Sequence, residues 1–256
     1  MRSVQEVGAA YDAASVGWRA GPARMYGRLA EAMADHAPVP LRDAAVLDAG
    51  AGTGVAGEAL RRRGAGSVVA VDLAPGMLAG VPPPATVADL TRLPFRSGSF
   101  DLAAAAFSLN HFEDPTAATM ELHRVAGALL ATFFAPGWDH PAKADVDAVL
   151  TRYGFVAPGW YTEFKAGGTT GDPGPAELEA LAHHAGYAAS RAAVVEVDTG
   201  LGTPGDLVEW RFGMAHLAPW LATLEPTTLA AARREAEEAV TGLAPLVVSM
   251  VVLSAR

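Results

Sequence analysis

The sequence predicts an α/β fold with a doubly wound, mostly parallel sheet. The first observation is a strand at residues 45–49 that runs into a glycine-rich turn and then a helix at 53–63. The second is an apolar, valine-rich strand at 67–71 that ends in Asp72. Strands that are apolar throughout indicate a sheet covered by helices on both faces. The third is that strands and helices continue to alternate as far as residue 135, which is typical of βαβ units.

Composition limits the classes of function that fit this chain. A length of 256 residues suits one α/β domain with insertions, or two small domains. Cysteine is absent, which excludes disulfides, thiolate metal sites and cysteine nucleophiles. The formal net charge is −9 and the only basic cluster is Arg61-Arg62-Arg63, so we expect neither nucleic acid nor an anionic membrane as a partner. Because a signal-peptide pattern and a membrane-length apolar run are both missing, we expect a cytoplasmic protein.

The N-terminal segment is predicted to be helical. Apolar side chains recur through it at helical spacing, and Gly17, Gly21 and Pro22 divide it into two helices. We therefore expect an N-terminal helical cap at residues 1–40 and the main domain at residues 41–256.

The glycine-rich turn is the first candidate binding site. Gly50, Gly52 and Gly54 allow positive φ angles and let the backbone approach a ligand closely. A helix that starts beside them points its free N–H groups and the positive end of its dipole at that ligand. Asp48 ends the strand, and we expect its carboxylate to face the same crevice, where it would repel a pyrophosphate and attract an ammonium group.

Two other interpretations of this turn remain open. The run from Gly52 to Gly57 also fits the G-x-G-x-x-G pattern of dinucleotide-binding proteins, and an acid at the position of Asp72 suits the ribose of NAD. A tight turn without any ligand is the plainest alternative. Asp48 instead favours a ligand that places an ammonium group, and no pyrophosphate, at this point.

Four stretches of the chain resemble one enzyme family. The run from Asp48 to Gly54 (D-x-G-x-G-x-G) resembles motif I of the class I S-adenosylmethionine-dependent methyltransferases. Residues 72–78, 95–101 and 121–125 resemble the later motifs of the quinone-methyltransferase-like, small-molecule branch of that family. The resemblance implies a Rossmann-like sheet of seven strands, the last of them inserted antiparallel. It also implies S-adenosylmethionine as the cofactor, with S-adenosylhomocysteine as the product.

The same resemblance assigns roles to single residues. Asp72 would accept both ribose hydroxyls, the apolar residues that follow it would pack on the adenine, and the carboxylate of Asp89 would take the adenine amino group. Tyr11 and Trp18 resemble residues of the N-terminal helix that covers the cofactor, although both could equally be packing anchors. The implied cofactor residues are Tyr11, Asp48, Gly50, Ala51, Gly52, Gly54, Asp72, Leu73, Met77, Asp89, Leu90 and Phe107.

A candidate catalytic residue follows the fourth predicted strand, at 102–106. Ligands of open α/β sheets bind beyond the carboxyl ends of the strands, so the loop at 107–112 is expected to face the transferred methyl group. His111 matches a histidine often found there in the family, and an imidazole of ordinary pKa, ~6.5, can accept a proton at neutral pH. The alternative is that His111 only orients the loop while proximity to the sulfonium suffices for transfer.

After the fifth predicted strand, at 128–135, the regular alternation stops. Residues 136–175 are rich in glycine, proline and aromatic residues, and we predict helical acceptor-lid insertions there and at 202–243. A surface excursion with its own small core is the alternative for the first insertion. The candidate acceptor-binding residues are Trp18, His111, Trp160, Tyr161, Trp210 and His216.

The remaining predicted elements complete the sheet. The adjacent His183 and His184 point to different sides of their helix, so no metal site is expected. The expected helices lie at 141–152, 175–186 and 227–240, a further helical stripe at 206–224, and the expected strands at 192–197 and 246–253.

Together these features lead to one functional hypothesis. The chain is expected to transfer a methyl group from S-adenosylmethionine to a small-molecule acceptor, and the aromatic insertions favour an apolar or aromatic secondary metabolite. Whether oxygen, nitrogen or carbon is methylated stays open, as does the choice between a monomer and a homodimer. One alternative is a scaffold of the same fold that acts as a non-methylating cyclase or binding protein. The other is an NAD-dependent dehydrogenase, which leaves Asp48 and Asp89 unexplained.

Overall fold

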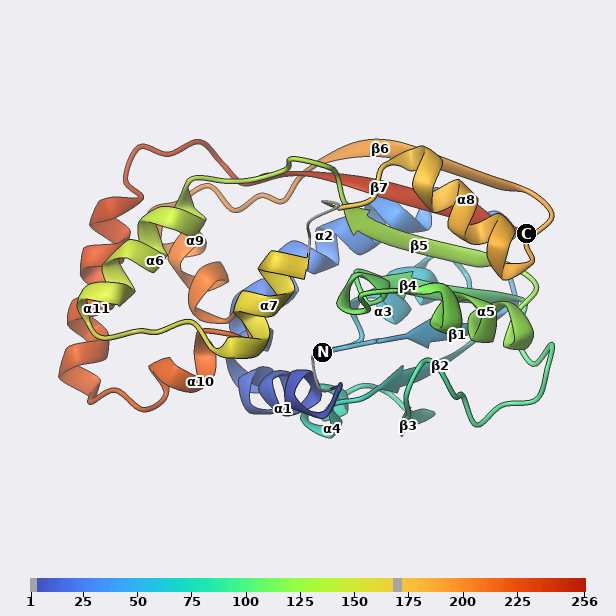
Figure 1. Cartoon of the computed structure of the whole chain (residues 1–256), viewed down its shortest axis with the longest axis horizontal. Helices are drawn as coiled ribbons and strands as arrows, with labels where there is room; N and C mark the ends of the chain where they lie inside the picture. Colours follow the sequence, from blue (N-terminus) through green and yellow to red (C-terminus); the bar gives the residue numbers. More distant parts are fainter. Residues whose placement is uncertain (1–3, 168–171) are drawn as a thin grey trace.

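A seven-stranded sheet forms the centre of the computed structural model, which describes residues 4–167 and 172–256 (Figure 1). The strands are β1 (Ala45–Ala49), β2 (Ser67–Asp72), β3 (Ala85–Val87), β4 (Leu102–Ala106), β5 (Leu129–Phe134), β6 (Ser190–Asp198) and β7 (Val247–Ala255). Their spatial order is β3-β2-β1-β4-β5-β7-β6, and β7 lies antiparallel between β5 and β6 while the other pairs are parallel. The predicted Rossmann-like, mostly parallel sheet with an antiparallel last strand is confirmed.

Helices cover both faces of this sheet, as expected of a doubly wound fold. They are α1 (Val4–Ala20), α2 (Pro22–Ala34), α3 (Val55–Arg62), α4 (Pro75–Leu78), α5 (Thr116–Val125), α6 (Ala142–Arg152), α7 (Gly159–Gly167), α8 (Pro175–Ala185), α9 (Pro204–Phe212), α10 (Ala218–Leu221) and α11 (Pro226–Ala239), with a short 3₁₀ helix, η1 (Leu109–His111). Side chains of α2 and α3 share one core cluster with the sheet, and side chains of α5 and α8 share the other. In the part of the chain that the structure describes, every helix is too short or too polar to span a bilayer.

The two core clusters follow from the pleat of the strands. Successive side chains of a strand point to opposite faces, so neighbouring apolar residues are buried in different clusters. In β1, Val46 packs in the cluster of Leu29 and Leu60, whereas Leu47 packs in the cluster of Leu122. All five side chains are fully buried, and the burial of Val46 and Leu47 on opposite faces explains why β1 is a continuous apolar run.

The N-terminal helices divide as predicted, at Gly21. A Cβ atom on Gly21 would lie 2.1 Å from the carbonyl oxygen of Glu209, so only glycine lets this backbone approach α9 so closely. Met25 and Leu29 bury α2 in the main core, while α1 lies over the carboxyl edge of the strands (Figure 1). The domain boundary at residue 40 stays a prediction, and residues 1–3 of the expected cap lie outside the described residues.

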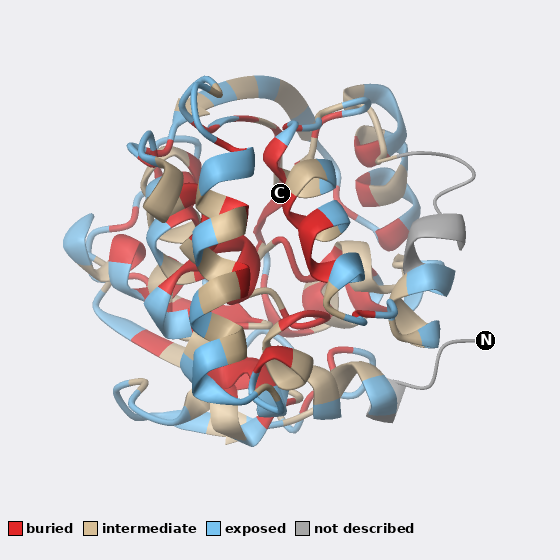
Figure 2. Cartoon of the chain, turned by 90° about the vertical axis from the view of Figure 1, so that its left-hand side faces the viewer, coloured by how far each residue is buried: buried red, intermediate tan, exposed pale blue. Residues whose placement is uncertain are grey.

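The two predicted insertions lie side by side, although they are far apart in sequence. Helix α11 of the second insertion packs against α6 of the first, and α6 also packs against α9. Together they form the helical cluster at the left of Figure 1, and Figure 2 shows that their buried faces turn inward and their exposed faces outward. Residues 168–171 of the first insertion lie outside the described residues.

Two details of these insertions differ from expectation. The glycine-rich part of the first insertion contains a helix, α7, that no periodicity indicated. The helical stripe expected over 206–224 is broken between α9 and α10. At this break a Cβ atom on Gly213 would lie 2.4 Å from the carbonyl oxygen of Gly17, so the chain turns where it touches α1. Pro219 lacks an N–H group and therefore fits the first turn of a new helix.

Candidate functional site

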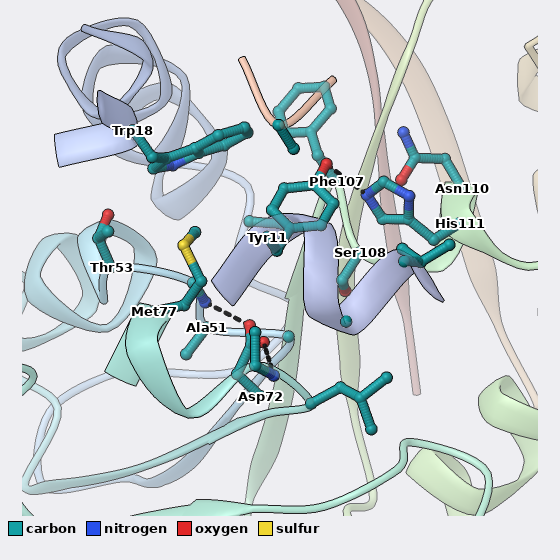
Figure 3. A pocket seen from close by; sticks show the side chains of 18 of the residues that line it. Tyr11, Trp18, Ala51, Thr53, Asp72, Met77, Phe107, Ser108, Asn110 and His111 are labelled. Carbon is teal, nitrogen blue, oxygen red and sulfur yellow. Dashed lines mark hydrogen bonds between the residues drawn. The ribbon is translucent and has the colours of Figure 1, made fainter. Parts of the chain in front are cut away.

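A cavity of about 240 Å³ lies at the carboxyl ends of the strands, where α1, the turn after β1, the loop after β4 and the lid insertions meet. Figure 3 shows this cavity from close by, with side chains of these segments turned toward one another. Its lining includes the following predicted site residues: Tyr11, Trp18, Gly50, Ala51, Gly52, Asp72, Leu73, Met77, Asp89, Leu90, Phe107, His111, Trp160, Tyr161 and His216.

The glycine turn brings the loops after β1 and β4 into contact. Gly50 has a φ of +71°, and a Cβ atom on it would lie 2.3 Å from the Cβ atom of Ser108. The Ser108 hydroxyl donates a hydrogen bond to the carbonyl oxygen of Ala49, 2.7 Å away. The N–H groups of Gly50 and Ala51 both donate to the carbonyl oxygen of Val71, at 2.8 Å each, and so tie the turn to β2. Glycine at position 50 is therefore required by both the backbone conformation and the close approach.

Asp72 holds this turn in place from the end of β2. Its carboxylate accepts hydrogen bonds from the N–H groups of Gly52, at 2.7 Å, and Ala74, at 2.9 Å (Figure 3). Burial raises the pKa of Asp72, and these backbone hydrogen bonds counteract the increase. Each carboxylate oxygen has a further lone pair, so Asp72 can accept additional hydrogen bonds from a ligand in the cavity.

The wall next to Asp72 is apolar and ends in a second carboxylate. Met77 is almost fully buried, and its Cε atom lies 3.4 Å from the position that a Cβ atom on Gly52 would occupy. Leu90 is buried beside Asp89. Asp89 accepts hydrogen bonds from the backbone N–H and the hydroxyl of Thr91, both at 2.8 Å. This region can enclose a flat apolar group and accept a hydrogen bond at its edge.

Asp48 is placed differently from expectation. Its carboxylate does not line the cavity but lies under the turn, where Oδ2 accepts a hydrogen bond from the N–H of Gly57 at 2.8 Å. A Cβ atom on Gly57 would lie 2.8 Å from that oxygen, so glycine there lets α3 come close to the end of β1. Oδ1 is buried without a hydrogen-bond partner in the described part of the chain. Burial raises the pKa of Asp48 to about 7.

The raised pKa predicts a pH-dependent loss of stability. Between pH 4 and 7 the folded protein keeps a proton on Asp48 that the unfolded chain has lost, so the free energy of unfolding falls as the pH rises. We expect Asp48→Asn, which still offers an oxygen to Gly57, to stabilise the ligand-free protein at pH 8 by about 2 kcal/mol and to change little at pH 4. Urea unfolding at both pH values measures this. Parallel pH profiles of the variant and the natural protein would contradict it.

His111 lies opposite the turn and contacts the N-terminal helix. Its Nε2 atom lies 3.1 Å from the hydroxyl oxygen of Tyr11, and the two rings meet edge to face at 5.2 Å (Figure 3). Burial raises the pKa of Tyr11. Phe107, at the start of this loop, has a φ of +53°, a strained conformation for a bulky residue that redirects the chain at the end of β4. This strained residue thus lies in the loop that places His111 in the cavity wall.

Aromatic rings form a continuous wall on the side away from Asp72. The ring of Trp18 stacks on Tyr26 at 5.1 Å, Tyr26 meets Phe107 at 5.3 Å, and Phe107 meets Phe134 at 4.7 Å. The sequence did not single out Tyr26 or Phe134, nor Asn110, whose buried Oδ1 has no hydrogen-bond partner among the described residues. The only hint in the sequence was their place beside residues already singled out: Asn110 precedes His111, and Tyr26 follows the buried Met25 of α2.

Residues of the two insertions also line the cavity. The rings of Tyr161 and His216 stack in parallel with centroids 3.6 Å apart. Behind them, Arg211 is 2% exposed, and its guanidinium lies 2.7 Å from Oδ1 of Asp147 and 3.3 Å from Nε2 of His216. Because a guanidinium group only donates hydrogen bonds, Nε2 of His216 must accept, and the ring is neutral.

Two further predicted site residues lie outside the cavity wall. Trp210 is 2% exposed and belongs to the main core, where it faces His140, because α9 turns that side of the stripe toward α6 and α2. Gly54 caps α3 with a φ of +82° and faces Val81 instead of the cavity. Within residues 4–167 and 172–256, no group of three or more histidine or carboxylate side chains is placed to hold a metal ion.

A family model matches the part of the chain that supplies the glycine turn, Asp72 and the His111 loop of this site. A family model described as "Methyltransferase domain" matches residues 47–128. A malonyl-[acyl-carrier protein] O-methyltransferase of Halorhodospira halophila is 39% identical over 118 residues, which cover 41% of this chain and 40% of that protein. A demethylmenaquinone methyltransferase of Streptomyces avermitilis is 34% identical over 116 residues, covering 42% and 48%. The aligned region thus spans less than half the length of either relative.

A similarity in structure extends over more of the chain. A solved structure from Anabaena variabilis, described as a methyltransferase from an antibiotic biosynthesis pathway, superposes with a TM-score of 0.59. The match covers 88% of this chain and 96% of that one, at 16% sequence identity. At that identity the likeness shows a shared fold.

Proposed function

We propose that this chain, which contains a class I S-adenosylmethionine-dependent methyltransferase domain, transfers a methyl group from S-adenosylmethionine to a small-molecule acceptor. The observation that carries the proposal is the convergence of the glycine turn, Asp72 and the His111 loop on one cavity. Residues 47–128, which supply all three, are the residues that match the methyltransferase model.

The residues present fit this cofactor. Asp72 offers free lone pairs where a ribose would lie, and the apolar wall of Met77 and Leu90 with Asp89 at its edge suits an adenine. A Cβ atom on Gly52 would come within 3.4 Å of Met77 and narrow this space. The hydroxyl of Thr53 is buried in the cavity lining without a hydrogen-bond partner in the described residues, so a ligand can supply one.

The aromatic wall supports an apolar or aromatic acceptor. Trp18, Tyr26, Phe107, Phe134 and Trp160 give the cavity flat apolar surfaces beyond the cofactor region. Among the described residues that line it, none is a lysine or arginine that would bind a phosphorylated acceptor. The net charge of −9 supports a small molecule rather than nucleic acid or an anionic membrane, and the absence of cysteine fits the reducing cytoplasm. A secondary metabolite with an aromatic ring is the class that we propose.

The chain's own residues would contribute alignment, a dry cavity and a proton acceptor. When bound, S-adenosylmethionine supplies an electrophilic methyl group. The aromatic wall and the lid exclude water and orient the acceptor for in-line attack. His111, with its ring oriented by the hydrogen bond between Nε2 and Tyr11, takes the proton that leaves the acceptor's nucleophilic atom.

Acceptor-dependent formation of S-adenosylhomocysteine tests the proposal. The purified protein is incubated with S-adenosylmethionine and a panel of hydroxylated, amino-substituted and quinone-type aromatic compounds, and the product is quantified by mass spectrometry. We expect turnover with at least one member and a product heavier by one methylene group. If S-adenosylhomocysteine binds but no acceptor in a wide panel is methylated, the scaffold alternative, a non-methylating cyclase or binding protein, replaces the proposal.

A further inference from the structure

Tyr26 is held rigidly in the wall of the cavity. It comes from α2, and its ring is stacked on Trp18, with centroids 5.1 Å apart and planes 18° apart. The edge contact with Phe107, at 5.3 Å, fixes the ring from the side of β4. Three elements of the fold therefore fix where the Tyr26 hydroxyl lies.

This hydroxyl has no hydrogen-bond partner within the described residues, whereas the hydroxyl of Tyr11, which also lines the cavity, lies 3.1 Å from Nε2 of His111. Tyr26 is half-buried and lines the cavity, so a ligand there can take the hydrogen bond that its hydroxyl can donate. Burial raises the pKa of Tyr26, although the positive charge of Arg211 counteracts this, so the hydroxyl stays protonated and able to donate.

The charge distribution around Tyr26 indicates which ligand atom fits. Arg211 is nearly fully buried, and its charge acts on the Tyr26 hydroxyl. Its guanidinium also holds His216 in the neutral form. Because the Tyr26 hydroxyl can donate a hydrogen bond, it fits an acceptor atom such as a carbonyl oxygen, and the positive charge of Arg211, although paired with Asp147, acts in the same direction.

His111 with Tyr11 forms a second polar group in the cavity lining. Trp18 contacts both tyrosines, with centroids 5.2 Å from Tyr11 and 5.1 Å from Tyr26. The cavity lining thus carries two polar groups, the Tyr26 hydroxyl and the Tyr11–His111 pair, and the ring of Trp18 contacts both tyrosines.

We propose that Tyr26 determines acceptor specificity, by donating a hydrogen bond from its hydroxyl to a carbonyl oxygen at the end of an aromatic acceptor remote from the methylated atom. The acceptor class is then a hydroxylated aromatic ketone or quinone-like compound. This inference rests on the proposed function, because it assumes that the nucleophilic end of the acceptor lies beside His111.

Binding of two matched probes tests the role of Tyr26 without requiring catalysis. The probes are 4-hydroxyacetophenone and 4-ethylphenol, which have nearly the same shape and differ in the carbonyl group. Each is titrated into the protein saturated with S-adenosylhomocysteine, using the natural protein, Tyr26→Phe and Tyr187→Phe. Tyr187 is the control, because its phenol likewise has no partner in the described residues but is buried in the other core cluster, away from the cavity.

We expect the natural protein and Tyr187→Phe to bind the ketone about fivefold more tightly than 4-ethylphenol. In Tyr26→Phe the two affinities should become equal, while the affinity for 4-ethylphenol changes little. Equal affinities in the natural protein, binding of neither probe, or a preference that persists in Tyr26→Phe would overturn the inference. The proposed function fails separately, at the first step, if S-adenosylhomocysteine itself does not bind.

Discussion

Replacing Asp72 with alanine is expected to weaken the binding of S-adenosylhomocysteine by a hundredfold or more. The variant lacks the carboxylate that would accept hydrogen bonds from the ribose, each worth about 1.5–3 kcal/mol when the acceptor is charged. It also leaves the N–H groups of Gly52 and Ala74 without the carboxylate oxygens that now lie 2.7 and 2.9 Å from them. Both effects act on the same site, so the loss of affinity should exceed that of any other single carboxylate in the cavity. Isothermal titration calorimetry measures it.

Asp101→Ala is the matched control for this substitution. Asp101 also accepts a backbone hydrogen bond, from the N–H of Ala45 at 2.8 Å. It precedes β4 and so lies at the amino ends of the strands, whereas the cavity lies at their carboxyl ends. We expect this variant to unfold at a lower urea concentration and to bind S-adenosylhomocysteine as the natural protein does. Equal affinities in the two variants would mean that Asp72 supports only the fold of the turn.

Replacing His111 with phenylalanine is expected to lower kcat by about 10²–10⁴-fold, the range typical of a positioned general base. Phenylalanine keeps the ring contact with Tyr11 and removes both nitrogen atoms. Because His111 lies beyond the proposed cofactor residues, the affinity for S-adenosylhomocysteine should change little. Single-turnover kinetics with saturating acceptor separate the chemical step from binding.

Tyr11→Phe and His123→Phe complete this experiment. Tyr11→Phe removes the hydrogen bond to Nε2 of His111, and we expect a smaller fall in kcat, about tenfold, because the ring of His111 is then less well oriented. His123 meets Tyr187 edge to face beside the core cluster of α5, away from the cavity, and its substitution should leave kcat unchanged. If His111→Phe keeps its full rate, transfer relies on proximity alone.

The central fold was predictable because its local signals are strong. The strand at 45–49 coincides with β1, and the acid that ends the second strand coincides with the end of β2. Both strands are apolar on their two faces. The turn between β1 and α3 needs positive φ angles and close backbone contacts, and the glycines that permit them are visible in the sequence.

The acceptor side was harder to predict, because it depends on contacts between distant segments. Trp210 belongs to the predicted stripe, but α9 packs that side against α6 and α2 and so leaves Trp210 in the core. Tyr26 becomes a cavity residue only because α1 brings Trp18 against it. The spacing of apolar residues within one segment does not predict contacts with a distant segment.

The position of the Asp48 carboxylate was also not predictable from the sequence. Its residue type and spacing matched the family motif, yet the sequence could not show that the N–H of Gly57 binds the carboxylate beneath the turn. The same contact explains the glycine at position 57, which first suggested a dinucleotide pattern, as a packing requirement of α3.

The most direct measurement of the central claim is a calorimetric comparison of S-adenosylmethionine, S-adenosylhomocysteine and NADH as ligands of the natural protein. We predict micromolar binding of the first two ligands at one site per chain and no binding of NADH. Binding of NADH alone would contradict it and favour a dehydrogenase, and binding of none of the three would contradict the assignment of the cavity to a nucleoside cofactor.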